Sequence, residues 1–287
     1  MARSKLRRSA DLTAGLSFKP HASHAARSRL KKDDPRFNVA LARGLEILMA
    51  FRQGERYLSN VELFERTGIP KATVSRLTYT LGKLGFLRYG EDTGLYELMP
   101  PVLALGYNVL SNVELHEIAR PFMNDLARDS GGTVGLATRD GLHVIFLESV
   151  RGAAQPMPKV AAGTRFPIPQ TVLGWAIMAT LPAGERAAVM RDLAEEHRHD
   201  WRQIEKDLDH AAKEIAERGF CVALGKLMPT HNSAAAPFLH PDGTRLFAVS
   251  CYGPASLMTK ESLYERWGPR LVELTARLNG SIHGANA

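Results

Sequence analysis

Apolar residues in the first third of the chain recur at helical spacing. Between residues 38 and 53 an apolar side chain returns every three or four positions, at Leu41, Leu45, Leu48 and Phe51, which predicts an amphipathic helix. A shorter helix is expected in the segment SNVELFERTG, where Ser59 or Asn60 can cap its start and Gly68 can end it.

The segment IPKATVSRLTYTLGKLGF predicts a third helix with two distinct faces. Pro70 suits its first turn. The apolar stripe consists of Val74, Leu77, Leu81 and Leu84. The opposite face is polar and basic with one aromatic side chain, and carries Ala72, Ser75, Arg76, Tyr79 and Lys83, with Lys71 on the flank.

Two short strands are expected next, at residues 86–89 and 95–98, joined by a turn that contains Glu91, Asp92 and Gly94. Three helices and a β-hairpin in this order predict a winged helix-turn-helix. Pro100 and Pro101 then interrupt the chain, and the apolar helix expected after them is interpreted as a connector to a second domain.

From near residue 112 the chain alternates predicted helices with strands. A hairpin is expected around the turn Asp140-Gly141, with further strands within residues 220–224, 234–239 and 245–252, and helices within 111–131, 171–182, 185–197, 204–219 and 262–280. The first of these helices is expected to break near Pro121, and residues 151–169, with four prolines, to form an irregular loop. Few strands with helices grouped around them predict an α+β sandwich with an antiparallel sheet.

Composition excludes several classes of protein. With 45% hydrophobic residues over 287 positions, the chain can build one large core or two ordinary ones. No run approaches the roughly 18 apolar residues that cross a bilayer, and the start lacks the apolar segment of a secretory signal, so a cytoplasmic protein is expected. The two cysteines, Cys221 and Cys251, lie in apolar segments and are interpreted as reduced core thiols.

Charge is distributed unevenly along the chain. Lys and Arg number 37 and Asp and Glu 30, which gives a formal charge of +7 with neutral histidines. The first 35 residues hold nine basic and three acidic side chains, residues 36–100 hold nine and seven, and the remainder is close to neutral. Residues 1–36 are interpreted as a disordered basic arm, which is either attracted to nucleic-acid phosphates or only a solvated tail.

Several motifs together carry a family resemblance: LARGLEIL, TGIPKATVSRLTYTLGKLGFL with a hairpin ending in YEL, GTRFPIPQTVLGWAIMATLP, ERGF, AAAPF and VSCYGPA. Across roughly residues 38–281 the chain resembles the IclR family of bacterial transcription regulators. The resemblance implies a winged helix-turn-helix DNA-binding domain (37–99), a linker helix (100–111) and an effector-binding and oligomerisation domain of GAF-like or profilin-like fold (112–287). It also implies a cytoplasmic dimer or tetramer on double-stranded operator DNA, acting as repressor or activator.

The third helix is expected to enter the major groove, where base edges are displayed distinctively. Arg76 is the first candidate for a base contact, because its guanidinium can donate two hydrogen bonds to a guanine. Lys71 and Thr73 lie early in the helix, where they can reach phosphates. The remaining candidates are Ser75 and Tyr79 on the helix and Arg88 on the wing. The alternative for each is a solvated surface residue.

The resemblance also carries over the positions of an effector pocket, at the start of a helix and on two strands: Val172, Leu173, Ala223, His231, Ser233, Ser250 and Tyr252. These residues offer two hydroxyls, a phenol, an imidazole and apolar walls. The helix N-terminus near Thr171 adds N–H groups suited to a carboxylate. A small organic acid, with an aromatic one favoured, is the expected ligand, and no cofactor is expected.

Departures from the family pattern bear on that ligand. Trp175 stands where Lys or Arg is usual, Lys226 occupies a commonly acidic position, and Thr230-His231 replaces a Gly-Val-like pair. Members that bind small keto acids often carry an acid at the position of Ala223. The sequence therefore argues against a glyoxylate-type ligand and for a larger or less polar one, while the favoured interpretation of Trp175 itself is a packed core indole.

Two other function classes compete with a ligand-controlled regulator. Catalysis is the least favoured, because no G-x-S-x-G, H-E-x-x-H, P-loop or dinucleotide motif occurs, and no catalytic residue is expected. The histidines lack the spacing of metal ligands, so no metal site is expected. The remaining alternative is a DNA-binding protein whose second domain serves only oligomerisation.

Overall fold

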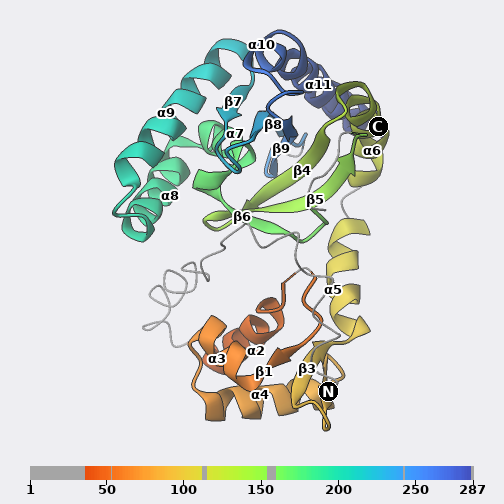
Figure 1. Ribbon diagram of the computed structural model, residues 1–287, viewed down its shortest axis with the longest axis vertical. Helices are drawn as coiled ribbons and strands as arrows, with labels where there is room; N and C mark the ends of the chain where they lie inside the picture. The colour runs from red at the N-terminus through yellow and green to blue at the C-terminus, as the bar shows by residue number, and fades with distance from the viewer. Residues whose placement is uncertain (1–35, 53, 112–114, 154–159, 242, 286–287) are drawn as a thin grey trace. The chain divides into compact units, whose positions relative to one another are not determined.

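The computed structural model describes residues 36–52, 54–111, 115–153, 160–241 and 243–285 (Figure 1). Almost all of the expected basic arm therefore lies outside the described residues. The chain divides into two compact units, Met1–Ser111 and Asn112–Ala287.

Three helices and a small antiparallel sheet form the N-terminal unit. The helices are α2 (Val39–Met49), α3 (Asn60–Thr67) and α4 (Lys71–Lys83), and the sheet has the order β1-β3-β2 (Leu58–Ser59, Leu95–Leu98 and Leu87–Gly90). The helix α5 (Pro100–Ser111) follows the sheet. The predicted winged helix-turn-helix is confirmed, and β1 is a strand that the sequence pattern did not indicate.

Local capping signals determine where these helices begin and end. Asn38 accepts a backbone N–H of the first turn of α2 at 3.0 Å. Ser59 and Glu62 form a reciprocal capping box at the start of α3, and Gly68 ends that helix with a φ of 68°. Pro70 precedes α4 and supplies no side-chain cap.

The core of the N-terminal unit lies between the helices and the sheet and contains Ile47, Ala50, Leu58, Leu63, Ile69, Val74 and Leu87. The buried face of α2 differs from the predicted stripe: Ile47 is fully buried, whereas Leu41 and Leu45 are 64% and 49% exposed. The reason is that α4 packs against the face of α2 that carries Ile47 and Leu48. Leu84 is also exposed, because α4 ends just before it.

A six-stranded antiparallel sheet forms the centre of the C-terminal unit. Its strand order is β6-β5-β4-β9-β8-β7. The strands are β4 (Thr133–Asp140), β5 (His143–Arg151), β6 (Arg165–Pro167), β7 (Cys221–Leu224), β8 (His231–Leu239) and β9 (Leu246–Pro254). The predicted α+β class with an antiparallel sheet is confirmed, although β6 lies in the segment expected to be an irregular loop.

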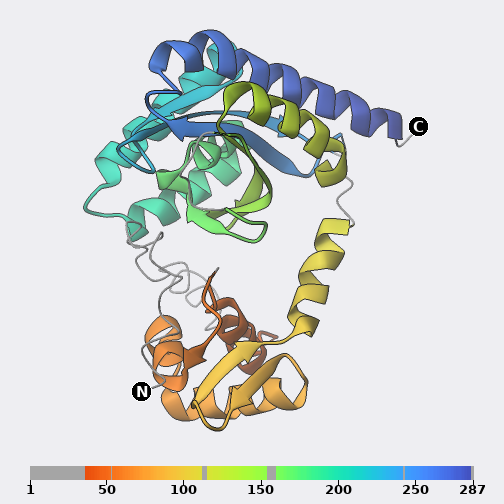
Figure 2. The same ribbon diagram turned by 45° about the vertical axis from the view of Figure 1, so that its right-hand side comes forward.

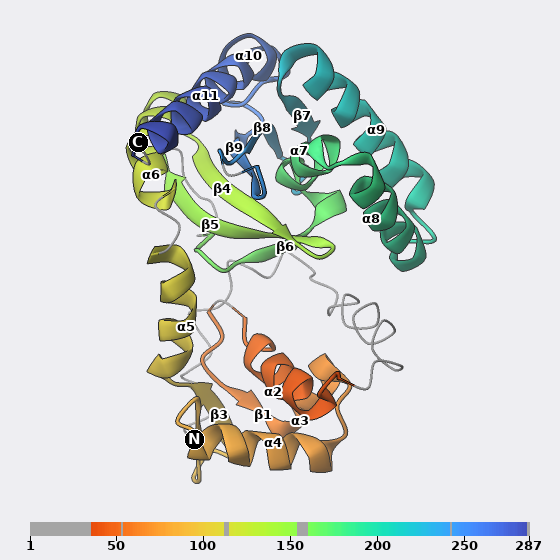
Figure 3. The same cartoon turned by 180° about the vertical axis from the view of Figure 1, so that it is seen from behind.

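Helices cover both faces of this sheet. On one face pack α6 (Leu115–Ser130) and α11 (Gly268–Ala285) (Figure 2). On the other face lies α7 (Val172–Thr180), preceded by the 3-10 turn η1 (Ile168–Gln170). The helix α9 (Trp201–Arg218) packs on α7, and α8 (Ala183–Glu196) packs on α9 (Figure 3).

Two prolines behave differently from expectation in these helices. The expected break at Pro121 is wrong, because α6 runs through it. A proline in the second turn removes one backbone hydrogen bond, and the helix is held by the buried side chains of Leu115, Ala119, Met123 and Leu126. The closing helix is instead interrupted: α10 (Lys260–Ser262) leads into a π-helical segment, η2 (Leu263–Trp267), just before Pro269.

Both cysteines are buried and neither forms a disulfide. Burial raises the pKa of Cys251 to about 11 and that of Cys221 well above its ordinary value. Both thiols are therefore protonated at neutral pH and serve as small core side chains.

The two faces of α2 predict opposite outcomes for two alanine substitutions. Ile47→Ala removes a fully buried side chain and should lower the free energy of unfolding of the N-terminal unit by about 2–5 kcal/mol. Leu41→Ala, on the exposed face of the same helix, should change it by less than about 1 kcal/mol. Urea unfolding, monitored by hydrogen exchange of peptides from residues 36–99, measures the free energy of unfolding of both variants. Equal losses of stability would contradict the assigned buried face of α2.

Candidate nucleic-acid interface and ligand pocket

The outer face of α4 is polar, basic and free of carboxylate partners. Val74 and Thr78 are buried, while Arg76, Tyr79 and Lys83 point away from the core and are exposed. The Lys83 ammonium lies 5.4 Å from the centroid of the Tyr79 ring. Within the described chain, the Arg76 guanidinium has no hydrogen-bond or ion-pair partner, so its donors are available to an external acceptor.

The flank of α4 beside α3 carries the predicted residues Lys71 and Ser75. The Lys71 ammonium lies 5.5 Å from the centroid of the Phe64 ring on α3. The Ser75 hydroxyl accepts a hydrogen bond from the amide of Asn60 at 2.9 Å and donates one to the Lys71 carbonyl at 3.1 Å. Ser75 is therefore engaged with both helices, and Asn60 is a polar residue that sequence reasoning had considered only as a cap.

The start of α4 is open to solvent. Thr73 is partly exposed, and its backbone N–H donates to the Pro70 carbonyl at 2.8 Å. The N–H groups ahead of it lack partners in the helix, and Pro70 has no side chain that could cap them. This end of the helix therefore carries partial positive charge that suits an anion.

On the wing, the predicted residue Arg88 is held in an ion pair. Arg88 on β2 stands opposite Glu97 on β3, and the two side chains pair across the strands. Glu97 also accepts a hydrogen bond from the Nε of Arg56 at 3.2 Å. Burial alone would raise the pKa of Glu97. The hydrogen bonds and charges of the two arginines lower it by more, so the net pKa lies below its ordinary value.

The Arg56 contact was missed because Arg56 and Glu97 are 41 positions apart in the sequence. The Arg88–Glu97 pair had a sequence signal, since hairpin register places these two residues opposite each other. Both guanidinium groups remain largely exposed on their outer sides.

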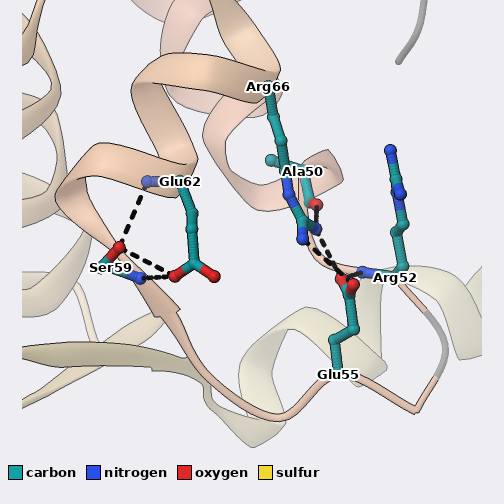
Figure 4. A network of polar contacts seen from close by, with 6 residues as sticks. All are labelled: Ala50, Arg52, Glu55, Ser59, Glu62 and Arg66. Atoms are coloured by element: carbon teal, nitrogen blue, oxygen red, sulfur yellow. Dashed lines mark hydrogen bonds and ion pairs between the residues drawn. The ribbon is translucent and has the colours of Figure 1, made fainter. Parts of the chain in front are cut away.

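A second ion pair joins α3 to the segment that follows α2 (Figure 4). Arg66 donates to the two carboxylate oxygens of Glu55 at 2.5 and 3.0 Å, and to the Ala50 carbonyl at 2.9 Å. The backbone N–H of Arg52 adds a hydrogen bond to Glu55 at 3.3 Å. Burial raises the pKa of Glu55, but the hydrogen bonds and charge of Arg66 outweigh burial, and the net pKa lies below its ordinary value.

In the C-terminal unit, one face of the sheet carries all the strand residues of the predicted pocket. Alternate residues of a strand point to the same face, and Ala223, Ala235 and Ala248 all pack in the core beneath α7. The α7 side of β8 and β9 therefore also carries His231, Ser233, Ser250 and Tyr252. Ala223, Ser233 and Tyr252 stand side by side on three neighbouring strands.

The start of α7 contributes the remaining predicted pocket residues, Val172 and Leu173. Both are buried in the same core as Ala223. Thr171 caps the helix by accepting the backbone N–H of Gly174 at 3.0 Å. The five strand residues thus lie on the sheet face that α7 covers, and the other two lie in the first turn of α7.

His231 has a ring nitrogen that is fully buried and lacks a hydrogen-bond partner in the described residues. Its Nδ1 lies 2.9 Å from the Thr230 hydroxyl, and its ring stacks on Tyr252 with centroids 5.1 Å apart. Its Nε2 is buried and has no hydrogen-bond partner in the described part of the chain. Burial lowers the pKa of His231 and raises that of Tyr252 to about 12, so both rings are neutral at neutral pH.

Two residues that depart from the family pattern, Trp175 and Lys226, contact each other in the same unit. Trp175 on α7 is buried, and its indole N–H donates to the Pro169 carbonyl at 3.1 Å. The Lys226 ammonium lies 5.6 Å from the centroid of the Trp175 ring and forms an ion pair with Asp207 on α9. A cation–π contact and an ion pair thus connect α7, α9 and the loop that leads to His231.

Among the described residues, no His, Cys, Asp and Glu side chains gather in groups of three or more that could hold a metal ion. Nor is any helix among them long and apolar enough to cross a bilayer.

Comparison with known proteins identifies relatives along both units. Residues 40–91 match the IclR helix-turn-helix domain, and residues 107–277 match the bacterial transcriptional regulator IclR C-terminal family. The chain is 34% identical over 248 residues to the HTH-type transcriptional regulator TsaQ1/TsaQ2 of Comamonas testosteroni, covering 86% of this chain and 89% of the relative.

Solved structures show the same fold. An IclR family transcriptional regulator from Brucella abortus superimposes with a TM-score of 0.81 at 35% identity, covering 92% of this chain and 99% of the other. An IclR homologue from Microbacterium hydrocarbonoxydans, complexed with 4-hydroxybenzoate, superimposes with a TM-score of 0.66 at 19% identity, covering 85% and 99%.

The Glu55–Arg66 pair predicts a pH dependence for the N-terminal unit. As a partly exposed ion pair it should stabilise the unit by about 1 kcal/mol at pH 7. Because the folded pKa is lowered from 4.5, this stabilisation is present above about pH 4.5 and is lost as the pH falls through the folded pKa.

Thermal melts of Glu55→Gln and wild type from pH 7 to pH 3 test this expectation. The variant should melt lower at pH 7, and the two curves should converge at pH 3. Glu65→Gln, which changes an exposed carboxylate on α3 next to Arg66, is the control and should match wild type throughout. A difference that grows toward low pH would show that Arg66 does not stabilise the ionised carboxylate.

Proposed function

The chain belongs to the IclR family of bacterial transcriptional regulators, and from that premise we propose that a small organic acid, bound in its C-terminal unit, controls its affinity for an operator. The protein is a DNA-binding regulator of transcription and not an enzyme. An aromatic acid is the favoured ligand class.

The observation that carries the ligand proposal is the buried, unpartnered Nε2 of His231 beside two serine hydroxyls and a phenol on one sheet face. A buried polar atom without a partner is costly, at about 1–3 kcal/mol. A ligand that supplies the missing hydrogen bond removes that cost on binding. The neutral His231 ring can donate from Nε2 to a carboxylate when Nδ1 accepts from Thr230.

The surroundings of His231 favour an acid with an apolar body. The first backbone N–H groups of α7 can donate hydrogen bonds to a carboxylate. Ala223 is small, apolar and buried, so this position favours an apolar part of the ligand. Stacked rings of His231 and Tyr252 offer an aromatic surface. The 4-hydroxybenzoate in the Microbacterium hydrocarbonoxydans homologue makes hydroxybenzoates the first ligands to test.

On DNA, α4 lies in the major groove in this proposal. Arg76, with free donors on the outer face, reads a base, and Lys71, Thr73 and the open helix start bind phosphates. Tyr79 belongs to the same contact surface, and Ser75 lies on its flank, where its hydroxyl is hydrogen-bonded to Asn60 on α3. Arg88 contacts the backbone beside the wing while Glu97 holds it in place.

The functional form is proposed to be a dimer, or a pair of dimers. The exposed apolar side chains of Leu41, Leu45 and Met49 form a stripe on α2, and a second copy of this chain is the partner proposed to cover it. Two half-sites compensate for the small positive charge of one DNA-binding unit. Analytical ultracentrifugation of wild type and Leu41→Gln measures whether this stripe supports self-association.

The proposed division of labour follows the two compact units. Residues 37–99 bind DNA, residues 100–111 link the parts, and residues 112–287 bind the effector and oligomerise; the boundary of the units after Ser111 supports this division. Ligand binding is proposed to act through the linker helix on the spacing of two DNA-binding units. Footprinting with and without ligand gives the sign of the response.

A substitution at His231 tests the ligand proposal. A panel of hydroxybenzoates and aliphatic acids is screened by thermal shift, and a ligand at 100 times its Kd should stabilise the protein by about 2.7 kcal/mol. His231→Phe keeps the ring stack but removes the nitrogen atoms, and should weaken binding of the active acid roughly 10- to 100-fold. His199→Phe, at an exposed histidine, is the matched control. If no acid stabilises wild type, the ligand proposal fails, and the alternative that the C-terminal unit serves only oligomerisation is favoured.

A substitution at Arg76 tests the DNA-binding face. The operator is obtained by selection from random-sequence duplexes, and binding is measured by fluorescence anisotropy. Arg76→Ala should cost about 1–3 kcal/mol at the operator and relax discrimination at one base pair. Arg191→Ala removes the same charge from an exposed site of the other unit and should leave the preference intact. Retained affinity and specificity in Arg76→Ala would show that this face does not read DNA.

A further inference from the structure

Asn60, the first residue of α3, is a polar side chain that the DNA-binding proposal leaves without a role. The cap of α3 is already complete without it, because Ser59 accepts the backbone N–H of Glu62 at 3.2 Å and its own N–H donates to the Glu62 carboxylate at 2.8 Å (Figure 4). The Asn60 side chain instead reaches across to Ser75 on α4.

The hydrogen bonds around Ser75 determine how the Asn60 amide is turned. A hydroxyl has one hydrogen, and Ser75 donates it to the Lys71 carbonyl at 3.1 Å. Ser75 can therefore only accept from Asn60, which places Nδ2 toward α4 at 2.9 Å. One N–H of that nitrogen remains uncommitted, and Asn60 is partly exposed to solvent.

Other donors lie on the part of α4 that carries Ser75. Lys71 lies one turn before Ser75 on the same flank of α4, with its ammonium held over Phe64. Lys71 is also the first residue of α4, where the backbone N–H groups lack partners within the helix. A phosphate oxygen is an acceptor only, so this set of donors matches a DNA backbone phosphate better than a base edge, which presents donors as well.

In a helix-turn-helix the first helix of the motif crosses the DNA backbone while the second enters the groove. We propose that Asn60 donates its free N–H to a backbone phosphate at the edge of the major groove, and that Ser75 is a positioning residue acting through Asn60. This inference rests on the proposed placement of α4 in the groove and is independent of the effector.

A double-mutant cycle on the full chain tests the proposal, with the selected operator duplex as the probe. Asn60→Ala should weaken binding about 10-fold, the loss expected for one hydrogen bond to a charged group. The factor should be the same for the operator and for single-base variants of it, because a phosphate contact carries no sequence information. Ser75→Ala should weaken binding less, and should add nothing in the Asn60→Ala background.

Two further variants separate a DNA contact from a structural role. Asn60→Asp should bind more weakly than Asn60→Ala, because a carboxylate repels the phosphate; if Asn60 only supports α3, an acid in the first turn should preserve binding. Thr80→Ala removes a similar hydroxyl on α4, which bonds to the Arg76 carbonyl at 3.1 Å but has no partner on α3. It should bind within twofold of wild type, and all variants should share the wild-type Tm.

Three results would overturn the proposal: unchanged binding by Asn60→Ala, additive losses from Asn60→Ala and Ser75→Ala, or a loss that depends on the base sequence. Arg76→Ala, measured in parallel, distinguishes a wrong placement of α4 from a wrong role for Asn60. If Arg76→Ala also binds like wild type, the placement of α4 in the groove is wrong. If Arg76→Ala loses affinity and Asn60→Ala does not, only the role of Asn60 is wrong.

Discussion

The C-terminal unit depends on a helix that has almost no solvent face. Seven of the nine residues of α7 are buried, so apolar partners are required on nearly every side of it. A Cβ atom at Gly174 would lie 2.4 Å from the Ile168 carbonyl oxygen, which means that only glycine lets α7 approach η1 this closely. Each large apolar side chain buried in this way contributes about 1.5–3 kcal/mol, and the sheet and α9 are the surfaces that α7 contacts.

The position of α7 determines where polar groups can gather. Beneath the helix the sheet carries small side chains, Ala223, Ala235 and Ala248, which allow close packing. The polar residues of the same face, His231 among them, follow on β8 and β9. Lys226, in the loop that leads to His231, contacts Trp175 on α7 and pairs with Asp207 on α9. The proposed ligand site therefore adjoins a loop that is connected to both helices.

In the N-terminal unit, ion pairs decide which positive charges remain available. Glu97 pairs with Arg56 and Arg88, and Glu55 pairs with Arg66. The cations of α4 have no such partners in the described chain. The charge surplus of this unit is small, but three basic side chains without an ion-pair partner in the described chain, Lys71, Arg76 and Lys83, lie on the one helix α4. In the proposed DNA complex, specific recognition therefore depends on a few placed side chains rather than on overall charge.

Sequence by itself determined the elements whose causes are local. The cap at Ser59, the glycine at Gly68, helical periodicity and hairpin turns act over a few residues, and they predicted the winged helix-turn-helix and the α+β class, while the resemblance of several motifs indicated the family. Periodicity could not decide between two apolar faces of α2, because the choice of Ile47 over Leu41 depends on where α4 packs. The same limit applies to β6, to the continuous helix through Pro121, to Arg56 with Glu97, and to Asn60 with Ser75. These features were decided only by the tertiary structure, because each arises from contacts with residues beyond the local sequence window.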